Sequence, residues 1–138
     1  MPSRDLYHQS VIHALQKEDW TITDDPLYVE FAEINFYIDL GAERLLAASR
    51  GDEKIAVEIK TFKRASIIAE FHTALGQFMN YRLALEMEQP ERILYLAVPE
   101  EIYHNFFQQA FGKIVIQHYA LKLLVYTISS EEIVTWIN

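Results

Sequence analysis

The sequence predicts an α/β domain in which helices flank a mixed central β-sheet. Segments with apolar residues at helical spacing alternate along the chain with segments of strand character. Arg92 to Val98 is almost continuously apolar, which is typical of a central strand buried on both faces. Before that strand, Ser66 to about Glu88 carries the apolar stripe of a long amphipathic helix. This order of elements indicates an α/β sandwich built around one sheet.

Composition indicates a single domain with a substantial core. The chain has 138 residues, of which 51% are hydrophobic, so we expect one domain spanning residues 1–138. The absence of cysteine excludes disulfides, thiolate nucleophiles and cysteine-ligated zinc. The longest apolar runs are too short for a membrane span and the N-terminus lacks a secretory pattern, so we expect a soluble, cytoplasmic protein.

The N-terminal part is predicted to hold one helix followed by strands. Ser3 to Glu18 has apolar residues at helical spacing, and Asp24-Asp25-Pro26 is typical of a turn. We expect an extended segment from Leu27 to Phe31 and a strand from Ile34 to Leu40. Glu43 to Ser49 fits a short helix by propensity, but its place between two strand-like segments favours a strand.

The rest of the chain is predicted to alternate strands and helices. A turn at Arg50 to Glu53 leads into the strand KIAVEIKTF, and Ser66 is the expected N-cap of the long helix, which Pro90 ends. After the strand Arg92–Val98, we predict a helix at Glu100–Phe111 closed by Gly112, strands at Lys113–Tyr119 and Lys122–Thr127, and a final helix at Ser129–Trp136 capped by Ser130.

Charged residues interrupt the apolar strand that follows the turn. Alternate side chains of a strand share a face, so Glu58 and Lys60 point away from Val57 and Ile59. Asp39 lies among apolar residues in the preceding strand segment, and if the two segments pair, Asp39, Glu58 and Lys60 converge. Charges within buried strands are paired, bind a metal or take part in chemistry. These three residues are therefore the first candidates for a functional site.

Two neighbouring carboxylates form an oxygen-rich site that suits Mg²⁺ or Mn²⁺. Asp39 and Glu58 are the predicted metal ligands, and the backbone carbonyl of Ile59 is a further candidate ligand. In such sites the metal binds phosphate oxygens and lowers the pKa of an attacking water. Lys60 is the predicted third catalytic group, because an ammonium can orient that water or stabilise negative charge in a phosphoryl transition state.

A structural interpretation of the same residues stays open. Glu58 and Lys60 would then form a solvent-facing pair on an amphipathic strand, and Asp39 would cap a turn. Gln77 and Tyr81, one helical turn apart, would be a polar edge of the long helix. The net charge of −8 argues against a dedicated, high-affinity nucleic-acid binder, but leaves open an enzyme that holds nucleic acid through metal ions.

The order of these motifs resembles the PD-(D/E)xK nuclease superfamily, which has the restriction-endonuclease-like fold. Asp39 and a Gly-Asp turn precede an apolar strand ending in Glu58-Ile59-Lys60, and a capped helix carrying Gln77 and Tyr81 follows. The Gln-x-x-x-Tyr pair is similar to that of the RecB-like branch, where it leans over the metal site and the nucleic acid. The resemblance implies a catalytic role for Gln77 and nucleic-acid contacts from Gln77 and Tyr81. Lys63, just past the motif, is a further candidate for a phosphate contact, although an ordinary solvated loop explains it equally well.

Nearly the whole chain resembles the XisH family, the fdxN element excision controlling factors. The resemblance is carried by RDLYH, DWTITDDPL, YIDLGAERLLAA, KIAVEIKTF, FHTALGQFMNYR, YLAVP and the terminal IVTW. It implies a role in controlling programmed excision of a DNA element in cyanobacteria. The partners that it implies are DNA, a site-specific recombinase and a companion XisI-type protein. The superfamily often has an acidic residue on its first helix, and here Asp5 comes early and Glu18 late.

Two hypotheses of function follow. The first is a Mg²⁺- or Mn²⁺-dependent endo- or exodeoxyribonuclease, or a DNA-processing factor derived from one. The alternative is a catalytically silent regulatory module that keeps the nuclease fold and binds a partner protein. The aromatic residues between Tyr103 and Phe111 would serve either a homodimer contact or interior packing.

Overall fold

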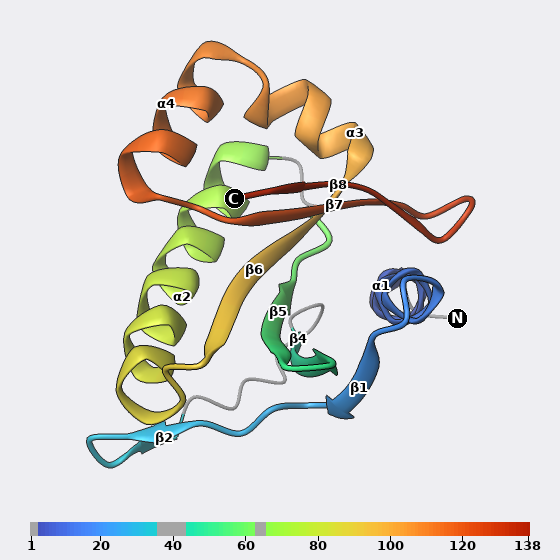
Figure 1. Ribbon diagram of the computed structural model, residues 1–138. Coiled ribbons are helices and arrows are strands. Elements are labelled where there is room, and N and C mark those ends of the chain that lie inside the picture. The colour runs from blue at the N-terminus through green and yellow to red at the C-terminus, as the bar shows by residue number, and fades with distance from the viewer. Residues whose placement is uncertain (1–2, 36–43, 63–65) are drawn as a thin grey trace.

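The computed structural model describes residues 3–35, 44–62 and 66–138 of the chain. Helix α1 lies on one side of a mixed sheet and α2 on the other, with the segment from α3 to α4 at one end (Figure 1). The described elements are α1 (Ser3–Lys17), β1 (Thr21–Asp24), β2 (Glu30–Phe31), β3 (Ile34–Asn35), β4 (Arg44–Arg50), β5 (Glu53–Ile59), α2 (Ile67–Glu88), β6 (Arg92–Pro99), α3 (Glu100–Ile102), the π-helical turn η1 (Tyr103–Phe107), α4 (Ala110–Tyr119), β7 (Leu123–Thr127) and β8 (Glu132–Ile137).

The strands of the main sheet lie in the order β1-β4-β5-β6-β7-β8. Strands β5, β6 and β7 run parallel, whereas β4 pairs antiparallel with β1 and β5, and β8 pairs antiparallel with β7. Helix α2 connects β5 to β6, because two parallel neighbours need a long crossover. The predicted α/β architecture, a mixed sheet flanked by helices, is confirmed.

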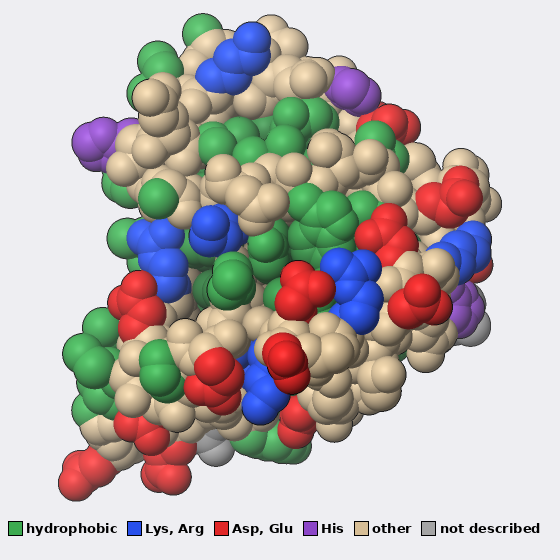
Figure 2. Space-filling model, in the orientation of Figure 1, with side chains coloured by type: hydrophobic (Ala, Val, Ile, Leu, Met, Phe, Trp, Pro, Cys, Tyr) green, Lys and Arg blue, Asp and Glu red, His purple; other side chains and the backbone are tan. Residues whose placement is uncertain are grey.

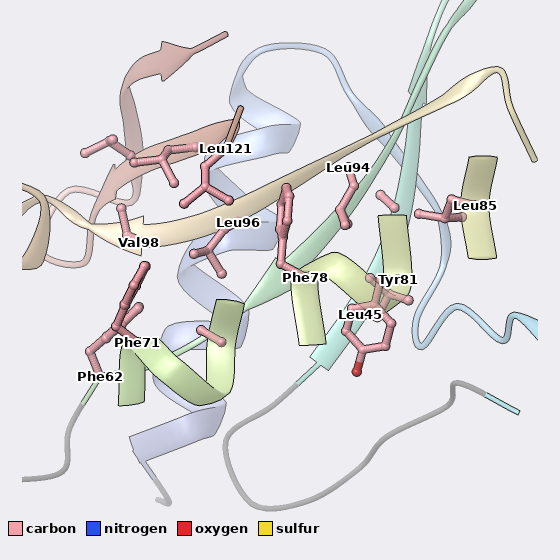
Figure 3. Packing of buried hydrophobic residues seen from close by; sticks show 14 of the residues in the cluster. Leu45, Phe62, Phe71, Phe78, Tyr81, Leu85, Leu94, Leu96, Val98 and Leu121 are labelled. Atoms are coloured by element: carbon pink, nitrogen blue, oxygen red, sulfur yellow. The ribbon is translucent and has the colours of Figure 1, made fainter. Parts of the chain in front are cut away.

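The two faces of the sheet build two separate hydrophobic cores. Ile55 and Val57 of β5 face α1, whereas Ala56, between them in the alternation, faces α2. Figure 3 shows the α2-side core, in which residues of the sheet pack against one stripe of the helix. The labelled side chains of this core are Leu45, Phe62, Phe71, Phe78, Tyr81, Leu85, Leu94, Leu96, Val98 and Leu121.

Helix α2 forms as the sequence predicts. The side chain of Ser66 accepts a hydrogen bond from the backbone N–H of Ala69 at 3.2 Å, which satisfies one of the free donors of the first turn. The stripe of Phe71, Phe78 and Leu85 is buried against the sheet. The helix ends two residues before Pro90, which cannot continue it.

The predictions for the N-terminal part hold where the structure describes them. Glu43–Ser49 was expected to be a strand, and β4 covers nearly all of this range. The turn between β4 and β5 has Gly51 at φ 60°, a conformation that glycine adopts without strain. Of the predicted strand Ile34–Leu40, only the start is described, as β3, and residues 36–43 lie outside the described ranges. Among the described strands, the neighbours of β5 are β4 and β6.

The prediction of a strand at Lys113–Tyr119 is wrong, because this segment belongs to α4. The helix predicted to run to Phe111 ends earlier, at the π-helical turn, and Gly112 lies inside α4 instead of closing a helix. The β-branched residues of this segment suggested a strand, but Val115 is buried in the α2-side core with helical spacing from Gly112. Tertiary packing has overridden local propensity here.

The prediction of a closing helix at Ser129–Trp136 is also wrong, because the segment forms a turn and then β8. Strand β8 pairs with β7, placing Trp136 opposite Leu124. Three successive β-branched residues, Ile133, Val134 and Thr135, favour a strand over a helix. Ser130 does not cap a helix, because its hydroxyl bonds to the hydroxyl of Thr127 within the turn.

Tryptophan side chains join the two edges of the sheet on the α1 side. Trp20, just before β1, and Trp136, in β8, have ring centroids 6.0 Å apart. Trp136 also packs edge-on against Tyr95, at 4.9 Å. The guanidinium of Arg50 lies 4.6 Å from the centre of the Trp20 ring, a favourable cation–π distance. The α1-side core is therefore closed by a contact between Trp20, the residue before β1, and Trp136 of β8.

Part of the aromatic segment Tyr103–Phe111 packs inside the protein. Phe107 is buried in the α2-side core, and the ring of Phe106 lies 5.1 Å from that of Phe71. Phe111 is half exposed. Interior packing explains Phe106 and Phe107, and homodimerisation stays a prediction.

Replacement of Gly112 by alanine is expected to destabilise the protein by about 1–3 kcal/mol, the usual cost of overpacking. A Cβ atom at this position would lie on the backbone oxygen of Phe106 and 2.5 Å from Cα of Phe107, and backbone atoms cannot turn aside as a side chain can. Urea denaturation of the variant measures the loss.

Gly76→Ala is the matched control, because Gly76 also lies in a helix but a Cβ there meets nothing within 4 Å. This variant is expected to gain about 0.5–1 kcal/mol from the better helix propensity of alanine. Equal stability changes in the two variants would contradict the close packing of α4 on η1.

Tyr126 of β7 is fully buried, and its hydroxyl has no hydrogen-bond partner among the residues that the structure describes. Burial, and secondly the neighbouring Tyr7, raises the pKa of Tyr126 far above its ordinary value. Above about pH 10 the unfolded chain therefore loses this proton while the folded chain keeps it. The stability of the protein should fall as the pH rises through that range.

Tyr126→Phe is expected to stabilise the protein by about 1 kcal/mol, because it removes a buried hydroxyl without a partner. It should also lessen the alkaline loss of stability in denaturation curves recorded at several pH values. Tyr95→Phe is the control, since the Tyr95 hydroxyl donates to Oδ1 of Asn138 at 2.5 Å, and its removal should cost about 1 kcal/mol. Equal destabilisation of both variants would refute the assignment.

Candidate functional site

Strand β5 carries two charged side chains into the interior. Glu58 lies opposite Leu45 of β4 and Leu96 of β6, and both leucines belong to the α2-side core, so Glu58 points toward α2. Lys60 follows directly after the strand, and Phe62, two residues further on, is again part of that core. The alternation predicted from the sequence therefore places Glu58 on the side of the sheet that faces the long helix.

Both charged side chains are buried, with Glu58 only 1% exposed and Lys60 4% exposed. Both carboxylate oxygens of Glu58 are shielded from solvent. The interpretation of Glu58 and Lys60 as a solvent-facing pair is therefore wrong. The exposed charges of β5 are at its other end, at Glu53 and Lys54. Removing a carboxylate and an ammonium from water costs free energy, so this arrangement needs a structural or a chemical reason.

Helix α2 places Gln77 and Tyr81 on the same side of the sheet as Glu58. Gln77 is partly buried, and its side-chain oxygen is shielded from solvent. Tyr81 is 3% exposed and belongs to the α2-side core. Its ring lies with the core and its hydroxyl points away from the cluster (Figure 3). Tyr81 is thus no polar helix edge, and its contact with a nucleic acid stays a prediction.

Two of the predicted site residues lie outside the described ranges. These are Asp39 and Lys63. Within residues 3–35, 44–62 and 66–138, no three His, Cys, Asp or Glu side chains come together to hold a metal ion. Of the predicted ligand set, Glu58 and Ile59 are described, and Glu58 supplies the oxygen donors that Mg²⁺ or Mn²⁺ prefers. The described part of the set fits a hard cation by donor type, and the complete set stays a prediction.

A cavity that the sequence did not predict lies where the parallel strands end. It has a volume of about 360 Å³ and is lined by Thr61 after β5, Pro99 and Glu100 around the end of β6, and Thr127 at the end of β7. Ligands of open α/β sheets bind at the carboxyl ends of their strands. Thr61 adjoins Lys60 in the chain, so the cavity lies at the same end of the sheet as the buried charges, although neither Glu58 nor Lys60 lines it. No local pattern of residues predicts this cavity, because the order of the strands decides which loops meet.

The lining of the cavity also includes a titratable side chain. Tyr7 of α1 lines it together with Glu101. Burial of the phenol, and secondly the nearby Glu101 carboxylate, raises the pKa of Tyr7. Tyr7 is therefore a neutral hydrogen-bonding group in this cavity at physiological pH.

Comparison with known proteins identifies the family. The family model described as "XisH protein" matches residues 1–134. The chain belongs to the XisH family. A comparison with curated proteins gives no match. No helix in the described part of this XisH-family chain is long and apolar enough to cross a membrane.

Two solved structures are similar to this XisH-family chain over almost their whole length. One is an XisH family protein from Nostoc punctiforme PCC 73102, with 51% identity, a TM-score of 0.88, and coverage of 96% of this chain and 99% of that one. The other is an fdxN element excision controlling factor protein from Anabaena variabilis, with 50% identity, a TM-score of 0.89, and coverage of 97% and 99%. The resemblance predicted from the sequence motifs is confirmed at the level of the family.

Amine labelling should distinguish the two lysines of this strand region. Lys60 is buried and Lys54 is exposed, so acetylation of Lys54 by a small reagent is expected to be at least about tenfold faster, since an opening that costs about 1.4 kcal/mol slows the reaction tenfold. Mass spectrometry of peptides after brief labelling measures the two rates. In urea, where the chain is unfolded, the two lysines should react at similar rates. Similar rates in the folded protein as well would contradict the burial of Lys60.

Proposed function

We propose that this chain is a metal-dependent DNA nuclease, or a DNA-processing factor derived from one, with a restriction-endonuclease-like (PD-(D/E)xK) fold. The single observation that carries the proposal is the burial of Glu58 and Lys60 at the end of a central strand, on the side that faces α2. A carboxylate and an ammonium kept from water at the end of parallel strands are typical of a functional site. A strand that served only packing would be expected to hold apolar residues there.

The family supports excision of a DNA element as the process in which the protein acts. One similar structure is named as an fdxN element excision controlling factor protein. Excision breaks and rejoins DNA strands, so a phosphodiester-cleaving or strand-binding role is chemically consistent with that name. By family resemblance, DNA, a site-specific recombinase and an XisI-type companion are the proposed partners.

The residues of the chain divide the chemistry among them. Asp39, Glu58 and the carbonyl of Ile59 would hold Mg²⁺ or Mn²⁺, which when bound activates a water and neutralises charge on the phosphate. Lys60 would hold its ammonium beside the attacked phosphate and stabilise the charge that develops there. Gln77, on the facing helix, would orient the water or the phosphate by a hydrogen bond from its amide. The cavity lined by Thr61, at the same end of the sheet, would give room to the substrate strand.

A catalytically silent regulatory module is the second candidate, and the depth of burial favours it. A carboxylate that is 1% exposed gives a phosphate little access unless the surrounding chain moves. The same fold and charges could then serve to bind a partner protein. Glu58→Gln separates the two candidates, because it removes a metal ligand and changes the shape of the side chain little.

The nuclease proposal predicts DNA cleavage that depends on Mn²⁺ or Mg²⁺. Single-stranded, double-stranded and branched DNA are incubated with the protein and each metal, and cleavage is followed on denaturing gels. Asp39→Ala, Glu58→Gln and Lys60→Ala are each expected to reduce the rate at least about a hundredfold, as loss of a group that stabilises the transition state does.

Glu53→Gln and Lys54→Ala are the matched controls, because they change the same residue types at the exposed end of the same strand. They should leave the cleavage rate unchanged. Circular dichroism and thermal denaturation check that all variants fold. Absence of cleavage on every substrate, with the partner proteins present, rejects the nuclease and leaves the regulatory module.

A further inference from the structure

A small cavity at the opposite end of the sheet gathers positive charge. It has a volume of about 190 Å³ and lies between the second half of α2 and the starts of β6 and β7. Arg82, Arg92 and Lys122 line it together with a single carboxylate, Glu86. In a chain with only 12 lysines and arginines and a net charge of −8, three cations around one cavity form a distinct local field.

None of these three cations forms an ion pair with a carboxylate within the described residues. Arg82 donates from Nη1 to the backbone oxygens of Tyr119 and Ala120, at 3.0 and 3.1 Å. Arg92 donates from Nη1 to the backbone oxygen of Ile55 at 2.9 Å. These acceptors are neutral and fix the two guanidinium groups in position while leaving their charges uncompensated.

Further contacts of the two arginines are also to neutral groups. Arg82 Nη2 contacts the sulfur of Met79 at 3.0 Å, and Arg92 Nε donates to the side-chain oxygen of Gln89 at 2.9 Å. Lys122 is partly buried beside them. Two anchored guanidinium groups and one adaptable ammonium form a preorganised set of donors for an anion.

We propose that this cavity binds the phosphate group of a phosphate monoester. Three cations against one carboxylate match the two negative charges of a monoester better than the single charge of a carboxylate. The arginine forks match phosphate oxygens in geometry. The floor of the cavity is apolar, with Phe78, Leu94 and Pro90, so it accepts the first atoms of the group that the phosphate carries. At about 190 Å³ it is smaller than the roughly 300–1,000 Å³ of typical ligand pockets, which suits a phosphate head and not a complete nucleotide.

The positive charge is visible on the surface of the protein. In Figure 2, Lys and Arg side chains appear at several places, and two of these blue areas lie near each other at the left, beside hydrophobic side chains and over the region where α2 lies in Figure 1. Acidic side chains are spread over the lower part of the same face.

The site is separate from the buried charges of the proposed nuclease site. Lys54 of β5 pairs with Arg92, whereas Glu58 pairs with Leu96, four residues further along β6. At about 3.3 Å per residue, the two positions are about 13 Å apart along the strands. The phosphate site therefore does not depend on whether the chain cleaves DNA.

Two sources carry the same phosphate chemistry, namely a free phosphorylated small molecule and the phosphorylated end of a nucleic-acid strand. The probes are inorganic phosphate, glycerol 3-phosphate, and one oligonucleotide with either a 5′-phosphate or a 5′-hydroxyl end. Succinate serves as a dianion without phosphate. Binding is measured by calorimetry and by amide shifts in nuclear magnetic resonance spectra at low salt.

Glycerol 3-phosphate or the 5′-phosphorylated oligonucleotide is expected to bind with shifts at residues around Arg82, Arg92 and Lys122. Lys122→Gln should weaken this binding about tenfold, the size of one lost charge-assisted hydrogen bond. Within the described residues the Lys122 side chain makes no hydrogen bond or ion pair, and its backbone oxygen, which accepts from the N–H of Leu96 at 2.9 Å, is unchanged by the substitution, so this variant should fold. Lys113→Gln, on the exposed side of α4, is the matched control and should bind as the unaltered protein does.

The outcomes distinguish the two sources of the phosphate group and test the proposal. Preference for the phosphorylated over the hydroxyl end of the oligonucleotide, lost in Lys122→Gln, supports the site with a nucleic-acid end as ligand. Binding of glycerol 3-phosphate alone supports it with a free metabolite as ligand. Binding of succinate as tight as that of glycerol 3-phosphate, equal weakening by Lys122→Gln and Lys113→Gln, or no shifts with any phosphate probe would overturn it.

Discussion

The position of β5 between two hydrogen-bonded neighbours is the constraint on which the rest of the structure depends. Because β4 pairs with it in one direction and β6 in the other, its register is fixed on both sides. From Ile55 to Ile59, successive side chains of β5 are buried on alternate faces of the sheet, and a shift by one residue would exchange the two faces. This geometry holds Glu58 on the α2 side, so backbone pairing determines where the carboxylate lies.

The sheet keeps its two charged regions apart. The buried Glu58 and Lys60 lie where β5 ends, and the cationic cavity lies where β6 and β7 begin. In an acidic protein, this separation prevents Arg92 and Lys122 from neutralising Glu58 directly. The fold thus has two regions of different electrostatic character. One supplies the carboxylate oxygens of Glu58, and the other supplies cationic groups that suit an anion.

The sequence predicted the local patterns well because alternation and helical spacing are local properties. The direction of Glu58 relative to Val57, the N-cap at Ser66 and the stripe around Phe78 were all predicted and confirmed. The family likeness, spread over nearly the whole chain, was also confirmed. Long-range arrangement was less accessible. The predicted type of element was wrong for two segments, Lys113–Tyr119 and Ser129–Trp136. The first forms a helix whose Gly112 packs on η1, and the second forms β8, which pairs with β7. No local pattern reveals these contacts. The depth of burial of Lys60 and both cavities depend in the same way on strand order.

The contact between Trp20 and Trp136 has an optical consequence. The chain contains two tryptophans, and they lie against each other, one just before the first strand of the sheet and the other in the last strand. The intrinsic emission of the protein is therefore a local reporter, sensitive to docking of the C-terminal hairpin and silent about the interior beside α2. A fluorescence transition that precedes the loss of helical circular dichroism would reveal that the sheet opens at its edges before its centre dissolves.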